Sequence, residues 1–178
     1  MAVNATMRRF AIELSDVDRG VYDTLDLRVA QHPSEGTAYL VTRVLAYALH
    51  YEDGIEFSAG VSLDEAAVRV VDPTGVLRTW IEVGQPAATK LNRATKAADE
   101  VWIYTYKKPQ HLQREAASRR VHRLEEVRAF ALSPEFLEPI ERSIDRQNVW
   151  TVVRTDGVLM VSAGDEAAQT ELERVPLC

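Results

Sequence analysis

Apolar and polar residues alternate over the first part of the chain and predict two strands. FAIELSDV (10–17) alternates with a period of two, Asp18-Arg19-Gly20 forms a polar turn, and TLDLRVAQ (24–31) alternates again. Such a pattern is typical of an antiparallel β-hairpin. Apolar residues then follow at helical spacing and predict the buried face of a helix: Leu40, Val41, Val44, Leu45, Ala48 and Leu49.

The stretch HPSE (32–35) predicts where this helix begins. Ser34 is a residue type whose side-chain oxygen caps helix N-termini. Glu35 would then lie in the first turn, where the helix dipole favours a carboxylate. An acid at such a position is also common for purely local reasons.

A second hairpin is predicted after a short strand, IEFS (55–58). AAVRVV (66–71) and VLRTWIEV (76–83) flank the turn Asp72-Pro73-Thr74-Gly75. Proline at the second position of a turn and glycine at the fourth are typical of a type I turn. We therefore expect the two strands to pair antiparallel.

The next elements predict a parallel crossover. ATKLNRATKAA, near 87–97, has helical spacing, and VWIYTY (101–106) is nearly continuously apolar, as in a strand covered on both faces. Strand, helix and buried strand in succession favour a right-handed parallel connection. This arrangement places Glu82 at the carboxyl end of a central strand, where ligands bind in open α/β sheets.

The last third of the chain continues the same alternation. We expect a helix over 109–118, a strand over 127–132, and a helix capped by Ser133 with proline at its first position. Asp156-Gly157 between two apolar runs is a strong signal for a two-residue hairpin. The predicted fold class is therefore α/β, with a mixed central sheet flanked by helices and β-hairpins at both ends, in a single domain over 1–178.

Composition narrows the class of protein. The 178 residues are 46% hydrophobic and 27% charged, which is typical of a globular domain. We expect neither a membrane span nor a secretory signal, and so a cytoplasmic location. The single cysteine, Cys178, excludes an internal disulfide and a cysteine zinc cluster. The four histidines show no metal-ligand spacing, and no glycine-rich phosphate loop is present.

The net charge of −6 would repel nucleic acid, so a polyanionic partner needs a local basic surface. Segment 107–128 is the candidate, because only Glu115, Glu125 and Glu126 oppose its cations. It is either a nucleic-acid contact or an ordinary solvated helix face. Its seven cations are Lys107, Lys108, Arg114, Arg119, Arg120, Arg123 and Arg128.

Glu82 is the residue that most strongly suggests a site. Burying a lone carboxylate costs several kcal/mol, so a partner must offset it. If Pro73-Thr74 is a two-residue loop, Glu82 faces Glu65; if Gly75 takes a left-handed bulge position, Ala66 faces Glu82 and Asp64 lies diagonal to it. In both registers a second acid lies near. The repulsion is avoided if the strand does not reach that far, if one acid is protonated, or if a divalent cation such as Mg²⁺ bridges the two acids.

The helix that follows Glu82 carries Lys90 and Arg93 three residues apart on one face. These cations would lie near the same strand end. Alternatively, they belong to an ordinary solvated helix face.

Several of these stretches together resemble the YaeQ family of bacterial proteins. The resemblance runs over nearly the whole chain, and its motifs are short individually but specific jointly. They are HPSE (32–35), RVLAY (43–47), the acids at 64–65, WIEVG (80–84), the KLNRA helix and VWIYTY.

The resemblance implies a fold similar to restriction endonucleases of the PD-(D/E)XK group. In such enzymes acids hold a metal that activates water, and a lysine orients or deprotonates that water. Glu82 matches the acid of the D/E-X-K motif, and Glu35 matches a helix glutamate of that group. Asp64 or Glu65 lies near the first motif acid.

Two positions depart from that pattern. Gly84 stands where the group has lysine, and the Pro-Asp dipeptide is missing. Lys90 is the better replacement for the lysine, because a guanidinium such as Arg93 stays protonated and would clamp phosphate instead. Gln85 is a further candidate beside the site.

Two functions follow as hypotheses. One is Mg²⁺-dependent phosphodiester hydrolysis, with Mn²⁺ as a substitute, at Glu35, Asp64 or Glu65, and Glu82, assisted by Lys90 and Gln85. The other is a catalytically silent module that binds nucleic acid or a protein. Fold alone does not decide between them.

Overall fold

A computed structural model of the chain describes residues 4–58 and 64–178. The chain separates into two compact units, each built from two stretches of sequence. The first unit combines Met1–Val41 with Ser133–Leu172, and the second combines Thr42–Leu132 with Glu173–Cys178. The assignment of one domain to 1–178 stays a prediction.

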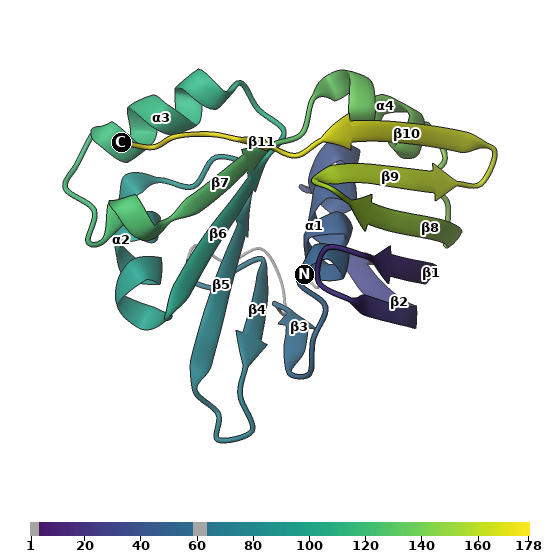
Figure 1. Cartoon of the computed structure of the whole chain (residues 1–178), viewed down its shortest axis with the longest axis horizontal. Helices are drawn as coiled ribbons and strands as arrows, with labels where there is room; N and C mark the ends of the chain where they lie inside the picture. Colours follow the sequence, from purple (N-terminus) through teal and green to yellow (C-terminus); the bar gives the residue numbers. More distant parts are fainter. Residues whose placement is uncertain (1–3, 59–63) are drawn as a thin grey trace. The chain divides into compact units, whose positions relative to one another are not determined.

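The first unit contains a five-stranded sheet in the order β10-β9-β8-β1-β2. Both terminal hairpins are confirmed, and β1 pairs with β8 in parallel, so the hairpins join into one sheet of their own (Figure 1). This pairing was not predicted. The strands are β1 (Thr6–Asp16), β2 (Val21–Gln31), β8 (Gln147–Thr155), β9 (Val158–Ala163) and β10 (Glu166–Glu171).

Local sequence fixes the ends of two elements in this unit. Asp156 and Gly157 both have positive φ angles, 51° and 75°, as the predicted two-residue turn requires. Helix α4 (Pro134–Arg142) begins as predicted, because the Ser133 side chain accepts a hydrogen bond of 3.2 Å from Phe136 N. The helix contacts β9 and β10.

The second unit contains a six-stranded sheet in the order β11-β7-β6-β5-β4-β3. The predicted hairpin of β4 and β5 and the parallel crossover from β5 to β6 are confirmed. The mixed α/β class is therefore confirmed, with two sheets rather than one. The strands are β3 (Ile55–Phe57), β4 (Val68–Val71), β5 (Leu77–Val83), β6 (Glu100–Thr105), β7 (Arg128–Ala131) and β11 (Glu173–Arg174).

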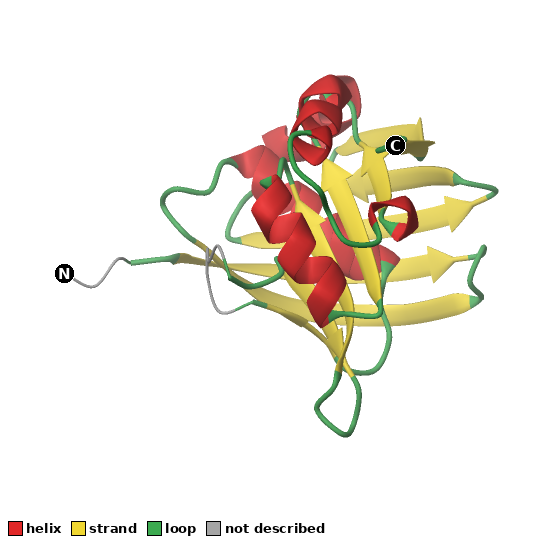
Figure 2. Cartoon of the chain, turned by 90° about the vertical axis from the view of Figure 1, so that its left-hand side faces the viewer, coloured by secondary structure: helices red, strands yellow, loops and turns green. Residues whose placement is uncertain are grey.

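Helices α2 (Ala88–Ala97) and α3 (Pro109–Ala117) cover one face of this sheet, as Figure 2 shows. A short 3-10 helix, η1 (Leu124–Glu126), precedes β7. The core beneath the helices is apolar because alternate strand residues point inward. It includes Trp80, Leu91, Ala94, Val101, Ile103, Leu112 and Ala116.

Helix α1 (Thr37–Leu49) lies where the chain passes from the first unit to the second. Its predicted apolar stripe is confirmed as buried. Its predicted start is wrong, because Ser34 and Glu35 lie in a turn before the helix. Glu35 N donates to His32 O at 2.8 Å, and the Ser34 hydroxyl bonds the His32 ring, so neither residue is in the first helical turn.

Both predicted registers for the β4–β5 hairpin are wrong away from its turn. Next to the turn Val71 faces Leu77, as the second alternative expects, but Val70 faces Thr79. Arg78 is therefore an extra residue on β5, which shifts the remaining pairs by one. The ladder ends at Val68 and Ile81, so neither Glu65 nor Ala66 faces Glu82.

The bulge has a physical cause in the charges near the turn. Asp72 Oδ1 accepts hydrogen bonds from Thr74 N and Val76 N, which widens the loop beyond two residues. Arg78 then bridges the carboxylates of Asp72 and Asp99. These side-chain bonds are not visible in the hydrophobic pattern.

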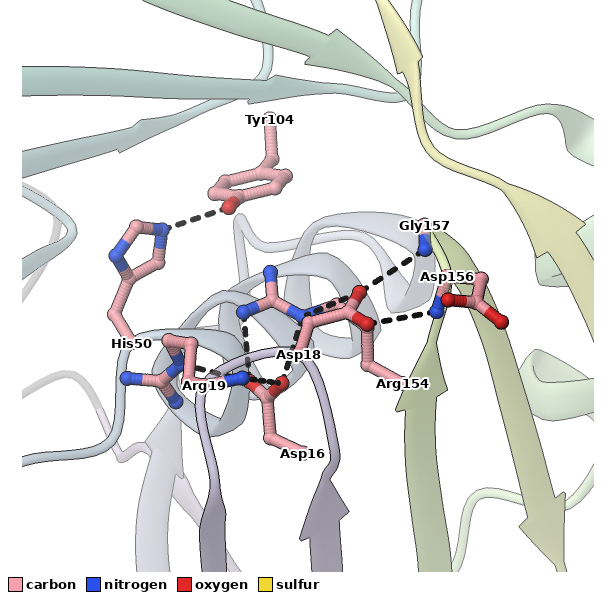
Figure 3. Close-up of polar contacts among 8 residues, drawn as sticks. All are labelled: Asp16, Asp18, Arg19, His50, Tyr104, Arg154, Asp156 and Gly157. Atoms are coloured by element: carbon pink, nitrogen blue, oxygen red, sulfur yellow. Dashed lines mark hydrogen bonds and ion pairs between the residues drawn. The ribbon is translucent and has the colours of Figure 1, made fainter.

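A fully buried carboxylate, Asp16, holds one end of the first unit's sheet (Figure 3). It contacts Arg19 and Arg154, each at 2.7 Å, and so ties the β1–β2 turn to β8. Asp18 accepts from the backbone of Asp156 and Gly157 at the next hairpin. Burial raises the pKa of Asp16, but the hydrogen bonds from both arginines outweigh it and hold that pKa below its ordinary value.

We predict that Asp16→Ala lowers the free energy of unfolding at pH 7 by about 3–5 kcal/mol, because it removes a fully buried carboxylate together with its ion pairs to Arg19 and Arg154. Since the folded pKa is lowered, the contribution of Asp16 is present above pH 3.8 and is lost as the pH falls through its folded pKa. Urea denaturation at several pH values measures both effects. Asp23→Ala, which removes an exposed acid of β2, is the control, and equal stability of the two variants would contradict the prediction.

Candidate functional site

Glu82 lies near the carboxyl end of β5, the strand between β4 and β6, as the sequence predicts. Only 4% of the residue is exposed. Strand alternation places it on the same face as Trp80, the face covered by α2. After Val83 the chain turns at Gly84, whose φ of 91° suits glycine, and enters α2.

Two donors satisfy the same oxygen of this buried carboxylate. Trp80 Nε1 donates to Glu82 Oε1 at 2.7 Å, and Lys90 Nζ lies 3.1 Å from that atom. Lys90 is in the first turn of α2, and the Ala88 N–H of the same turn donates to Glu115 on α3. The two helices therefore fix the lysine against the strand end.

The electrostatics of Glu82 are those of a desolvated acid with one cation beside it. Burial raises the pKa of Glu82, and the Lys90 charge and the two hydrogen bonds oppose that rise without cancelling it. The contribution of Glu82 to stability is therefore greatest below pH 4.5 and is lost as the pH rises through its folded pKa. Of the two cations expected near Glu82, Lys90 is the one seen in contact with its carboxylate.

The other predicted acids have different surroundings. Asp64 forms an ion pair with Arg93, and its side chain is 76% exposed, whereas the Glu82 side chain is 5% exposed. Glu65 is exposed, and Glu35 is a buried residue of the first unit. Gln85 is exposed just beyond β5. The structure therefore pairs Glu82 with Lys90 and Asp64 with Arg93.

This arrangement does not supply a ready set of magnesium ligands. Over residues 4–58 and 64–178, no group of three or more His, Cys, Asp or Glu side chains is placed to hold a metal ion. Glu82 Oε1 already contacts an indole N–H and an ammonium. The metal roles of Glu35, Asp64, Glu65 and Glu82 stay predictions.

The cations of the basic segment 107–128 fall into two groups: some contact other parts of the second unit, and others are exposed. Arg123 donates to Thr95 O and Ala98 O near the end of α2, and Arg128 lies over the Trp102 ring at 4.8 Å. Five cations are exposed and make no ion pair within the described part of the chain. They are Lys107, Lys108, Arg114, Arg119 and Arg120.

The other face of the second unit's sheet is aromatic, and sequence reasoning gave it no role. His50 Nε2 and Tyr104 Oη are 2.7 Å apart (Figure 3), and Trp102 and Phe130 stack at 6.0 Å. His50 thus has the structural partner expected of a histidine without metal-ligand spacing. Alternation along β6 is the signal that places Trp102 and Tyr104 on one face.

Comparison with solved structures places this fold in a known class. The structure matches a crystal structure of the YaeQ protein from Pseudomonas syringae with a TM-score of 0.90 and 26% identity, covering 98% of both chains. The YaeQ protein from Xanthomonas axonopodis pv. citri matches with a TM-score of 0.86 and 30% identity over 97% of both chains. The fold is therefore the mixed α/β fold of these proteins.

The chain belongs to the YaeQ family, whose model, "YaeQ protein", matches residues 1–172. Curated relatives are the uncharacterized proteins YaeQ of Escherichia coli (strain K12), at 29% identity, and of Salmonella typhi, at 27%. Each alignment covers 113 residues, 60% of this chain and 59% of the relative. No helix in the described ranges is long and apolar enough to cross a membrane.

We predict that Lys90→Met lowers the free energy of unfolding by about 3–5 kcal/mol at pH 8, because it leaves the Glu82 charge buried without a cation. The loss should shrink at pH 5, where Glu82 takes up a proton more readily. Denaturant titration at the two pH values measures this change.

The double variant Glu82→Gln/Lys90→Met should recover part of the loss, because the glutamine oxygen still accepts from Trp80. Lys96→Met, which removes an exposed lysine of the same helix, is the control. A Lys90→Met variant as stable as Lys96→Met at pH 8 would show that the ion pair does not hold the strand end.

Proposed function

We propose that this chain is a nucleic-acid-binding module without hydrolytic activity. Five exposed cations without ion-pair partners among the described residues carry the proposal: Lys107, Lys108, Arg114, Arg119 and Arg120. Unpaired Lys and Arg side chains bind phosphates by releasing counterions, without reading sequence. The proposal keeps the cytoplasmic location expected from the sequence.

The distribution of charge supports this surface. Segment 107–128 carries seven cations and three acids in a chain whose net charge is −6. Glu115, the acid nearest the exposed cations, accepts from Ala88 N and so has an internal partner. The rest of the chain is acidic and would repel a polyanion, which would orient it toward this segment.

Helix α3 gives the surface its shape. Leu112 and Ala116 are buried against the core, so Arg114, midway between them, points away from it. Lys107 and Lys108 precede the helix N-terminus, where the helix dipole favours a negative charge. Arg119 and Arg120 follow the C-terminus, so cations flank the helix at both ends.

The surroundings of Glu82 support the absence of hydrolysis. One of its oxygens is already engaged by Trp80 and Lys90, and Asp64 is paired with Arg93 at the surface. The ion pair instead gives Glu82 a structural role at the strand end.

We predict that Arg119→Ala/Arg120→Ala weakens binding to labelled single- and double-stranded DNA and RNA about equally for all sequences. The slope of log K against log salt should decrease by about one per charge removed. Fluorescence anisotropy over a salt series measures both quantities. The matched control is Lys96→Ala/Arg142→Ala, which removes two exposed cations elsewhere; equal loss in both variants would contradict the proposed surface.

A second candidate is Mg²⁺-dependent phosphodiester hydrolysis, which the 3.1 Å contact of Lys90 with Glu82 favours, because a lysine beside that acid replaces the one absent at Gly84. The binding-module proposal predicts no cleavage of DNA or RNA in Mg²⁺ or Mn²⁺ above the level of Glu82→Ala. Gel assays with both proteins measure this. Cleavage by the wild type that Glu82→Ala abolishes would instead support the hydrolytic candidate.

A further inference from the structure

A second cluster of cations lies on the first unit, on the outer face of its sheet. Phe10 and Ile12 of β1 are buried, so strand alternation places Arg9 outward. In the register of the sheet, Arg9 faces Arg28 on β2 and Gln147 on β8. Three neighbouring strands thus bring two arginines and an amide side by side.

Directly opposed like charges destabilise a sheet, so the pairing of Arg9 with Arg28 needs compensation. Asp26 provides part of it, because both its oxygens accept from Arg9 at 2.8 Å. The hydrogen bond from Arg9 lowers the pKa of Asp26, and Arg28 adds to this effect. Arg28 itself is exposed and has no ion pair among the described residues.

Two further arginines border the cluster. By the same alternation Arg8 belongs to the opposite face of β1 from Arg9, and its side chain donates to the Gln31 side chain at 2.6 Å and to Asp145 O at 2.9 Å. Arg146 is exposed and without an ion pair in the described ranges, and its carbonyl accepts from Arg9 N at 2.8 Å.

These residues line one open surface cavity of about 360 Å³. Arginine forks match phosphate oxygens in pairs, so several around one cavity suit a ligand with more than one phosphate. The cavity is lined by Met7, Arg8, Arg9, Arg28, Arg146 and Gln147.

The charges beyond the cavity limit the length of the ligand. Along the outer face of β1 the next residues are Ala11 and Glu13, and Glu13 is exposed. Asp26 faces Ala11 on the neighbouring strand. A long polyanion would meet these acids, whereas a compact one would not.

We propose that this cavity binds a compact anion bearing two or three linked phosphates, held by Arg28 and Arg146 with Arg9 beside them. The site lies in a different unit from segment 107–128 and does not depend on the proposed function. Arg28 and Arg146 supply charge that no ion pair with a described carboxylate engages.

Isothermal titration of the full chain with inorganic pyrophosphate, inorganic triphosphate and ADP tests the proposal. We expect saturable binding by the wild type, weakened at least tenfold in Arg28→Ala/Arg146→Ala. Both side chains are exposed and make no side-chain hydrogen bond to the residues that the structure describes, so the variant should keep the wild-type melting temperature. ADP binding like pyrophosphate would indicate contact with the phosphates alone; tighter ADP binding would indicate a nucleotide site.

Two control variants make the result specific. Arg119→Ala/Arg120→Ala, on the other unit, should bind pyrophosphate like the wild type, even if it loses nucleic acid. Arg28→Lys/Arg146→Lys should bind more weakly than the wild type, because it keeps charge and loses the forks. No wild-type binding at millimolar pyrophosphate, an unchanged affinity in Arg28→Ala/Arg146→Ala, or tighter binding of an acidic peptide than of triphosphate would overturn the proposal.

Discussion

The cost of burying a carboxylate constrains both units of this chain. Asp16 in the first unit and Glu82 in the second are almost fully withdrawn from water. Each is tolerated because cationic side chains lie within 2.7 to 3.1 Å. Strand ends that look independent in the sequence are thereby tied to elements elsewhere in their own unit.

The two acids are satisfied to different degrees, and this difference bears on function. Two arginines outweigh the desolvation of Asp16, so its pKa is lowered. For Glu82, one lysine and one indole do not outweigh the desolvation, so the pKa of Glu82 is raised. The lowered pKa of Asp16 is typical of a structural ion pair that stays charged. The raised pKa of Glu82 means that this acid takes up a proton at a higher pH than an ordinary glutamate. A raised pKa alone does not make an acid catalytic, because structural ion pairs perturb pKa values as well.

Much of the fold was predictable because hydrophobic periodicity records burial directly. The buried stripe of α1, the Ser133 cap and the Asp156-Gly157 turn all follow from local rules. The β4–β5 register did not, because the side chains of Asp72 and Arg78 insert a bulge that the apolar pattern does not encode. Strand β10 was missed, because its small and polar residues alternate without a hydrophobic signal.

The candidate site was predictable in part, for a similar reason. Glu82 stood out as an acid within an apolar strand, and helical spacing brought Lys90 toward it. The ion pair of Asp64 with Arg93 and the start of α1 depend on side-chain contacts that no spacing rule gives. The arginine cluster of the first unit was not predicted, because its residues come together only when strands distant in the sequence pair.

The parallel pairing of β1 with β8 also has a consequence for synthesis on the ribosome. About 120 residues must be translated after β2 before β8 can reach its neighbour, which takes on the order of ten seconds. During that interval the nascent hairpin has no β8 to pair with, and its apolar side, with Phe10, Ile12 and Leu27, lacks part of its final cover. Chaperone binding to this early segment would protect it until the late strands emerge.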